Sequence, residues 1–272
     1  MNYRHAFHAG NFADIVKHAA LLAMLRALQA DAAPLSVIDT HGGAGAYDLL
    51  GEMARRSGES DAIAALMADA GAPGALEPLK LAVGRFNKGG ELRLYPGSPV
   101  LAAEALRRQD RLVACELHPQ DHTLLAAALA RYPNATAVKG DGYRTAADAP
   151  GGRLLVLIDP PFERPDDYEQ TARAVGAIVR RNRSATVAVW LPLKDLETFD
   201  AFLRLLEDQV PSALVAEARL RPLTDPMKMN GCALVIANPP PGLADALRQV
   251  CEWVVSTLGE PGGEARLWRL GL

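Results

Sequence analysis

Short apolar runs alternate with helical patterns along most of this chain, and this alternation limits the possible folds more than any other feature. Strands are predicted within residues 35–48, 111–119, 135–142, 153–161, 185–193, 213–222 and 231–240. Helices are predicted over residues 13–29, from 98 onward, and over 121–131, 167–181, 194–207 and 243–258. Strands that alternate with helices are typical of a doubly wound, mostly parallel sheet. We therefore predict a Rossmann-like α/β fold with seven strands, the last two forming an antiparallel hairpin through the loop at 223–230.

Residues 50–90 interrupt the alternation. The stretch is rich in alanine, is broken by the segments GAPG and NKGG, and shows no convincing strand pattern. We interpret it as a small helical insertion within a single domain that spans residues 1–272. Hydrophobic residues make up 49% of the chain, which is enough for a sizeable core and argues against disorder.

The overall charge does not indicate a nucleic-acid binder. The formal net charge is −3, whereas such proteins usually carry a basic surface. A basic patch would have to be local, and its candidates are Arg4, Lys17, Arg164, Arg221 and Lys228. The cysteines show no paired spacing, and no apolar run is long enough to cross a membrane. We expect a soluble cytoplasmic monomer without a membrane partner.

A glycine loop follows the first predicted strand. In His41-Gly-Gly-Ala-Gly45, the glycines at 43 and 45 would let the backbone approach a ligand closely. Gly43 and Gly45 begin a dinucleotide fingerprint, but the third glycine of that fingerprint is missing. The loop alone fits a nucleotide cofactor and a plain structural turn equally well.

Acidic residues at the next two strand ends strengthen the case for a cofactor. Ligands of doubly wound sheets bind outside the carboxyl ends of the strands. Glu116 could accept hydrogen bonds from two ribose hydroxyls, and Asp141 could accept one from an adenine amino group. The backbone N–H of Gly142 could donate to an adenine ring nitrogen. Together these residues predict an adenosine site that makes no demand for a pyrophosphate.

Two proline-rich turns follow apolar strands, and we expect chemistry at the first. In Asp159-Pro-Pro-Phe162, the Asp159 carboxylate and the Pro160 carbonyl could both accept from one exocyclic amino group, and Phe162 offers a stacking face for a base. These two hydrogen bonds would position a poorly nucleophilic adenine amine against an electrophilic methyl group. The second turn, which begins at Asn238, lacks the aromatic residue, so we interpret it as structural.

The N-terminus mixes aromatic and cationic side chains. Tyr3 and Arg4, with His5, Phe7 and His8 after them, suit contacts with phosphates and bases, although a solvated terminus would look the same. His118 and His122 lack further ligands with suitable spacing, so we predict no metal site.

The motifs resemble those of one family. A [DN]PP[YF] motif after a glycine loop and acidic strand ends looks like the adenine amino-methyltransferases, and the seven-strand layout matches class I methyltransferases. The segments YRHAFHAGNFADIVKH, DTHGGAG, YPGSP, ELHP, GDG and IDPPF resemble more narrowly the RlmJ family of bacterial 23S ribosomal RNA adenine-N6 methyltransferases. The resemblance runs from residue 2 to about 240.

The resemblance implies roles for individual residues. S-adenosylmethionine would be bound by a set of residues spread along the chain, namely His18, His41, Ser98, Glu116, Asp141 and Gly142. Asp159 would be the catalytic acceptor, Tyr3 would lie near the ribosomal RNA substrate, and residues 50–90 would be the helical subdomain. Phe162 stands where tyrosine is commoner, which keeps the stacking face and removes a hydroxyl.

Other functions share these features. A DNA adenine-N6 methyltransferase uses the same four-residue motif, and a protein glutamine methyltransferase solves a similar problem, although Asp159 in place of Asn argues mildly against it. A non-catalytic RNA-binding factor could keep the same fold. The intact Asp159 and Glu116 favour an enzyme.

Overall fold

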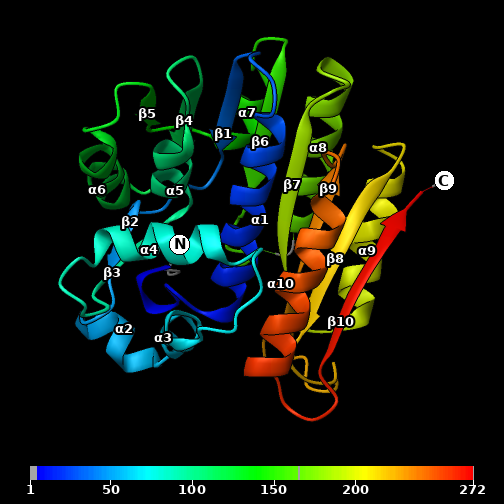
Figure 1. Cartoon of the computed structure of the whole chain (residues 1–272). Helices are drawn as coiled ribbons and strands as arrows, with labels where there is room; N and C mark the ends of the chain where they lie inside the picture. The colour runs from blue at the N-terminus through cyan, green and yellow to red at the C-terminus, as the bar shows by residue number, and fades with distance from the viewer. Residues whose placement is uncertain (1–4, 165, 272) are drawn as a thin grey trace.

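A large twisted sheet organises the chain, which the computed structural model describes for residues 5–164 and 166–271 (Figure 1). Its strands follow the order β10-β8-β9-β7-β6-β1-β4-β5. They are β1 (Leu35–Asp39), β4 (Arg111–Cys115), β5 (Ala135–Val138), β6 (Arg153–Ile158), β7 (Thr186–Leu193), β8 (Ala213–Arg219), β9 (Gly231–Ala237) and β10 (Glu264–Leu270). The five strands from β7 to β5 are parallel, whereas β9, β8 and β10 join antiparallel.

The predicted strand number is wrong by one, because the sheet has eight strands in the part of the chain that the structure describes. The additional strand, β10, pairs with β8 from Glu264↔Arg219 to Leu270↔Ala213 and forms an edge of the sheet. The predicted antiparallel hairpin of β8 and β9 is confirmed over Arg219↔Gly231 to Ala213↔Ala237. β9 runs against the parallel strands, so its carboxyl end lies at their amino edge.

Helices cover both faces of the sheet. On one face lie α1 (Phe12–Leu28), α5 (Ser98–Ala105), α6 (Pro119–Leu129) and α10 (Leu243–Leu258). On the other face lie α7 (Gly142–Ala147), α8 (Asp167–Arg181) and α9 (Leu196–Glu207). Alternate residues of β6 enter the two cores, Leu155 and Leu157 on the α1 side and Val156 on the α8 side, as the two-residue period of a strand requires. No helix within the described residues is long and apolar enough to span a membrane.

The stretch predicted as a helical insertion holds α2 (Glu52–Ser57), α3 (Asp61–Ala68) and α4 (Glu77–Phe86). It leaves and re-enters the main fold through a two-stranded sheet of β2 (Ala46–Asp48) and β3 (Leu94–Pro96), which the sequence did not predict. Ile63 and Leu79 of this stretch are fully buried in the same core as α1. Figure 1 shows these helices beside the amino end of α1, and the short helix η1 (His5–Phe7) contacts α2.

Local signals explain several helix starts. Asn11 caps α1, because its side-chain oxygen accepts a hydrogen bond from the Asp14 N–H at 2.9 Å. Gly97 holds the N-cap position of α5, so Ser98 is already helical, and Pro99 follows within the first turn. Helix α7 was not predicted. Asp141 caps it, accepting from the N–H groups of Tyr143 and Arg144.

Candidate active site

Four acidic residues meet at the carboxyl edge of the parallel strands. Asp39 ends β1, Glu116 and Asp159 directly follow β4 and β6, and Asp141 comes shortly after β5. These strands are consecutive neighbours in the order β6-β1-β4-β5. Neighbouring strands lie about 4.8 Å apart, so the four acids occupy roughly 14 Å of one edge. The fold thereby brings Glu116, Asp141 and Asp159, which the sequence predicted as site residues, to one edge together with Asp39.

A buried lysine contacts the carboxylate of the Asp-Pro-Pro-Phe turn. Lys17 Nζ of α1 donates to Asp159 Oδ2 at 2.5 Å and lies 2.9 Å from Asp14 Oδ1. Burial by itself would lower the pKa of Lys17, but Asp14 and Asp159 raise it well above its ordinary value. Lys17 is therefore a fixed cation that sets the orientation of the Asp159 carboxylate.

Asp14 connects this ion pair with two histidines. Burial would raise the pKa of Asp14, but His5, Lys17 and His18 hold it well below the usual range. His18 is 1% exposed, and its Nδ1 lies 2.7 Å from the Tyr95 hydroxyl. Burial lowers the pKa of His18 to about 3, so the ring is neutral near pH 7. In this arrangement His18 reaches a cofactor only if the groups that cover it move.

The turn after β6 is strained and is held by aromatic packing. Phe162 has φ 48°, in the left-handed region that costs a residue with a side chain roughly 1–3 kcal/mol. Its ring centroid lies 4.6 Å from that of Tyr168 and 6.3 Å from that of Trp190. Pro160 is buried, whereas Asp159 and Phe162 are partly exposed. The turn thus presents a carboxylate and a ring together at the edge of the sheet.

The second proline turn lies at the opposite edge. Asn238 also has a left-handed backbone, with φ 49°, and its Nδ2 donates to the carbonyls of Arg183 and Ala185 at 2.9 Å each. Thr186 Oγ1 in turn donates to the Asn238 carbonyl. These bonds tie β9 to the start of β7, which is the structural role that the sequence indicated.

Asp39 carries an unsatisfied buried oxygen. The residue is 2% exposed, and its Oδ1 accepts from the His41 N–H at 3.3 Å, but Oδ2 accepts from none of the described residues. Burial raises the pKa of Asp39 to about 6, with the neighbouring Ser98 hydroxyl working in the opposite direction. A buried acceptor without a donor indicates a place for a donor from a ligand.

The backbone of the glycine loop adopts conformations that favour glycine. Gly43 and Gly45 have φ of +58° and +79°. A Cβ on Gly43 would lie 2.3 Å from the Tyr47 hydroxyl. The Gly43 N–H donates to Glu116 Oε2 at 3.0 Å, and the His118 N–H donates to Glu116 Oε1 at 2.7 Å. Glu116 therefore already orders this loop, and it keeps further lone pairs for hydroxyl donors.

Asp141 and Gly142 also have structural roles. Asp141 Oδ1 accepts both capping bonds of α7, while the side chain remains exposed. A Cβ on Gly142 would lie 2.1 Å from the Thr40 carbonyl oxygen, so only glycine permits this approach of α7 to the end of β1. Neither role prevents the exposed Asp141 carboxylate from contacting a ligand.

The tautomer of His41 follows from its neighbours. Thr40 Oγ1 donates its hydrogen to the Leu157 carbonyl at 3.0 Å, and the same oxygen lies 2.7 Å from His41 Nδ1. Because the hydroxyl hydrogen is already used, Nδ1 must carry the proton and Nε2 must be an acceptor. Burial lowers the pKa of His41 to about 4, so this neutral form holds at pH 7.

Two predicted substrate contacts, Tyr3 and Arg4, lie outside the described residues. The predicted basic patch is not assembled as expected. Lys17 is buried between two carboxylates, and the other described candidates pair with acids, as Arg164–Asp166, Arg221–Glu260 and Lys228–Asp225.

Sequence reasoning assigned no catalytic or cofactor role to Asp14 and Lys17. Both lie on one face of a largely buried helix, three residues apart, and His18 follows at the next position. A polar stripe on an apolar helix was the available signal. Among the described residues, no group of three or more His, Cys, Asp or Glu side chains is placed to hold a metal ion.

The fold and the edge define the class of protein. A parallel sheet that ends in an antiparallel hairpin, with an acidic carboxyl edge and a glycine loop, is the Rossmann-like architecture of class I methyltransferases, as predicted. A family model described as "Ribosomal RNA large subunit methyltransferase D, RlmJ" matches residues 32–270. The chain belongs to this family, and its membership confirms the predicted cofactor, S-adenosylmethionine.

Individual relatives support the assignment to this family. The chain is 34% identical over 267 residues to the ribosomal RNA large subunit methyltransferase J of Escherichia coli (strain K12), with 96% of this chain and 95% of the relative covered. The protein of the same name from Haemophilus influenzae is 34% identical over 268 residues, with the same coverage. A solved structure from Legionella pneumophila has a TM-score of 0.89 at 28% identity, covering 96% of this chain and 98% of the other.

Proposed function

We propose that this protein transfers the methyl group of S-adenosylmethionine to the N6 amine of an adenine in 23S ribosomal RNA in the cytoplasm. One observation carries the proposal. The Asp159 carboxylate, in a turn with Phe162, stands at the carboxyl edge and is held there by Lys17. Family membership supports the ribosomal RNA substrate.

The donor set fits the cofactor. Asp39 Oδ2 is a buried acceptor without a donor, which suits the ammonium group of S-adenosylmethionine. Glu116 would hold the ribose hydroxyls, and Asp141 with the Gly142 N–H would hold the adenine. The other proposed cofactor contacts are His18, His41, Gly43, Gly45 and Ser98. When bound, the cofactor supplies an electrophilic methyl group on a sulfonium.

The residues of the turn would activate the amine by positioning. An adenine in a duplex would leave its stack and lie against Phe162, and its amino hydrogens would be accepted by Asp159 and the Pro160 carbonyl. Two acceptors on one amine favour a pyramidal nitrogen whose lone pair points at the methyl group. After transfer the amine loses a proton, to Asp159 or to water. Tyr3 and Arg4 would contact the RNA near the target.

Methyl transfer to RNA tests this proposal directly. Purified protein is incubated with tritiated S-adenosylmethionine and protein-free large-subunit RNA from cells that lack the activity, and the RNA is digested to nucleosides. Label in N6-methyladenosine is the expected result. Label in DNA instead would support the DNA methyltransferase alternative, and cofactor binding without any methyl transfer would support a binding factor.

Replacing the catalytic carboxylate gives a second test. We expect Asp159→Ala to reduce turnover by at least about 100-fold, because one of the two acceptors is lost, while cofactor binding stays within about threefold. Glu163→Gln is the matched control, since Glu163 is an exposed carboxylate in the same loop. Normal RNA methylation by Asp159→Ala would refute the mechanism.

A further inference from the structure

The two edges of the sheet differ in how their arginines are paired. At the carboxyl edge the arginines are matched by acids, as in the pairs Arg164–Asp166, Arg219–Glu217 and Arg221–Glu260. At the amino edge Arg107 and Arg153 are also paired with acids, but several other exposed arginines form no ion pair with any described residue. Four of these lie beside the starts of β4 and β7, namely Arg108, Arg111, Arg181 and Arg183. We call these four the arginine row. In a chain with a net charge of −3, such a concentration of unpaired cations is unexpected.

The row extends from the start of β4 to the start of β7, and at the start of β6 between them Arg153 pairs with Asp31. Arg111 begins β4, Arg108 precedes it, and Arg181 and Arg183 flank the turn from α8 into β7. Between them lie the starts of β1 and β6. Asn182 Nδ2 donates to the Gly152 carbonyl at 2.8 Å, which joins the β7 turn to the start of β6. Three strand spacings of about 4.8 Å give the row a length of roughly 14 Å, or about four nucleotides along one strand of a duplex.

A neighbouring arginine makes this edge rigid. Arg107 donates to both carboxylate oxygens of the fully buried Asp110 and to the carbonyls of Gln29, Asp31 and Ala33. Asp110 also accepts from the Leu35 N–H at 2.9 Å, which ties β1 to β4. Since Arg107 is fully used in the fold, Arg108 and Arg111 are presented from a fixed backbone.

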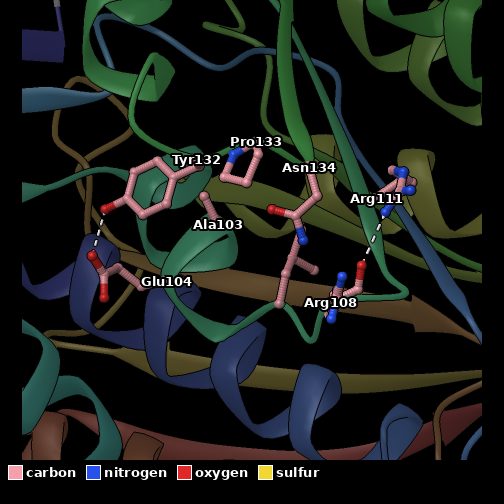
Figure 2. A pocket seen from close by; sticks show the side chains of 8 residues that line it. Ala103, Glu104, Arg108, Arg111, Tyr132, Pro133 and Asn134 are labelled. Atoms are coloured by element: carbon pink, nitrogen blue, oxygen red, sulfur yellow. Dashed lines mark hydrogen bonds between the residues drawn. The ribbon is translucent and has the colours of Figure 1, made fainter.

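A hollow adjoins Arg108 and Arg111, and its polar groups favour an anion. It is lined by Ala103, Glu104, Leu106, Arg108, Arg111, Tyr132, Pro133 and Asn134. Figure 2 shows Tyr132 and Glu104 joined on one side and Arg108 and Arg111 joined on the other. Glu104 accepts from the Tyr132 hydroxyl at 2.5 Å and from Arg131 at 3.1 Å, so its charge is already matched. The Arg111 guanidinium donates only to backbone carbonyls, those of Arg108 and Asp110, and the Arg108 guanidinium has no hydrogen-bond partner among the described residues.

Helix dipoles explain only part of the row. Cations are favoured at helix carboxyl ends, and Arg181 is the last residue of α8. Arg108, Arg111 and Arg183 lie outside helices, so that account does not cover them. Guanidinium groups bind phosphates through two parallel hydrogen bonds, and contacts to the backbone supply most of the affinity of proteins for nucleic acids.

We propose that the arginine row binds the phosphate backbone of the RNA substrate, far from the target adenine. This inference rests on the proposed function. β1 has five residues at about 3.3 Å each, so the row lies roughly 16 Å or more from the carboxyl edge. Only an RNA that extends well beyond the target nucleotide reaches both edges. The row therefore distinguishes long substrates from short ones.

Two double variants test the row independently, Arg108→Gln/Arg111→Gln and Arg181→Gln/Arg183→Gln. Each is compared on full-length protein-free 23S RNA and on the shortest nuclease fragment of that RNA that still accepts the methyl group. For the long RNA, we expect Kd to rise at least about tenfold and the slope of log K against log salt to fall by roughly 1.5–2. For the fragment, Kd and kcat should stay within about twofold.

Arg173→Gln/Arg266→Gln is the control, because it removes the same formal charge from the middle of α8 and from β10, where each arginine pairs with an acid away from the amino edge. Three results would overturn the proposal. Affinity could fall equally for the long RNA and for the fragment, or the control variant could lose as much affinity for the long RNA as the double variants do. Both double variants could also bind the long RNA normally. If the Arg108→Gln/Arg111→Gln variant does not fold, the Arg181→Gln/Arg183→Gln variant still tests the proposal. Methylation of the fragment by every variant keeps the proposed function intact, so the two failures are distinguishable.

Discussion

Asp39 makes the unliganded protein less stable than it could be. A buried carboxylate with an unpaired oxygen favours the protonated form, and burial raises the pKa of Asp39 to about 6 from an ordinary value near 3.9. The folded state therefore binds a proton more tightly than the unfolded state does. The resulting penalty is absent below about pH 4, grows between about pH 4 and 6, and is fully present above that range. A bound ammonium group would relieve it.

The variant Asp39→Asn separates stability from cofactor binding. It keeps the shape of the side chain and removes the charge, so we expect the unliganded variant to gain about 1–3 kcal/mol in free energy of unfolding at pH 7.5 and nothing near pH 4. Affinity for S-adenosylmethionine should fall at least about tenfold. Urea unfolding at both pH values and calorimetry of cofactor binding measure these effects. A variant that loses stability at pH 7.5, or that binds the cofactor normally, would show that Asp39 has another role.

At the scale of the element, α1 carries a buried polar stripe through an apolar core. Asp14, Lys17 and His18 lie on one face of the helix and are nearly fully buried. Lys17 lies between two carboxylates, so the charges of the stripe depend on one another. Such a network stabilises little by itself, but losing one member leaves an uncompensated charge in the interior.

Lys17→Met should therefore be strongly destabilising. We expect a loss of about 3–5 kcal/mol in the free energy of unfolding, because the buried Asp14 and the partly exposed Asp159 would remain as neighbouring acids without a cation between them. The double variant Lys17→Met/Asp14→Asn removes one of those charges and should recover part of the loss. Chemical denaturation at pH 7.5 measures both variants. If the double variant is no more stable than the single one, repulsion between these carboxylates is not the cause.

The elements with long, regular patterns were predictable from the sequence, and short or distant features were not. Apolar runs gave the parallel strands, and their parallel arrangement then brought Glu116, Asp141 and Asp159 to one edge. Strand β10 was missed because charged residues separate its apolar residues, because the alternation breaks at Leu267-Trp268, and because it follows the last predicted helix. Helix α7 has six residues, too few for a periodic signal. The contact between Lys17 and Asp159 depends on packing between α1 and the sheet, which no local pattern encodes.

At the scale of the whole molecule, the acidic residues of the candidate site and the contacts that fasten the sheet lie at opposite ends of the strands. The acidic carboxyl edge suits a cationic cofactor, and the insertion lies beside the amino end of α1, where Lys17 contacts Asp159 (Figure 1). The Arg107–Asp110 pair and Asn238 fasten the opposite edge. A rigid amino edge lets the loops of the carboxyl edge adapt to a ligand without loosening the sheet.

Cofactor binding should stabilise the whole fold. A ligand that binds only the folded state at 100 times its Kd adds about 2.7 kcal/mol, which for a chain of this size raises Tm by roughly 4–8 °C. We expect S-adenosylhomocysteine to produce this shift and adenosine alone to produce less, because adenosine leaves Asp39 Oδ2 without a donor. Thermal unfolding with each ligand measures the difference. A fold that S-adenosylhomocysteine does not stabilise at any concentration, while RNA still binds, would favour the non-catalytic binding factor.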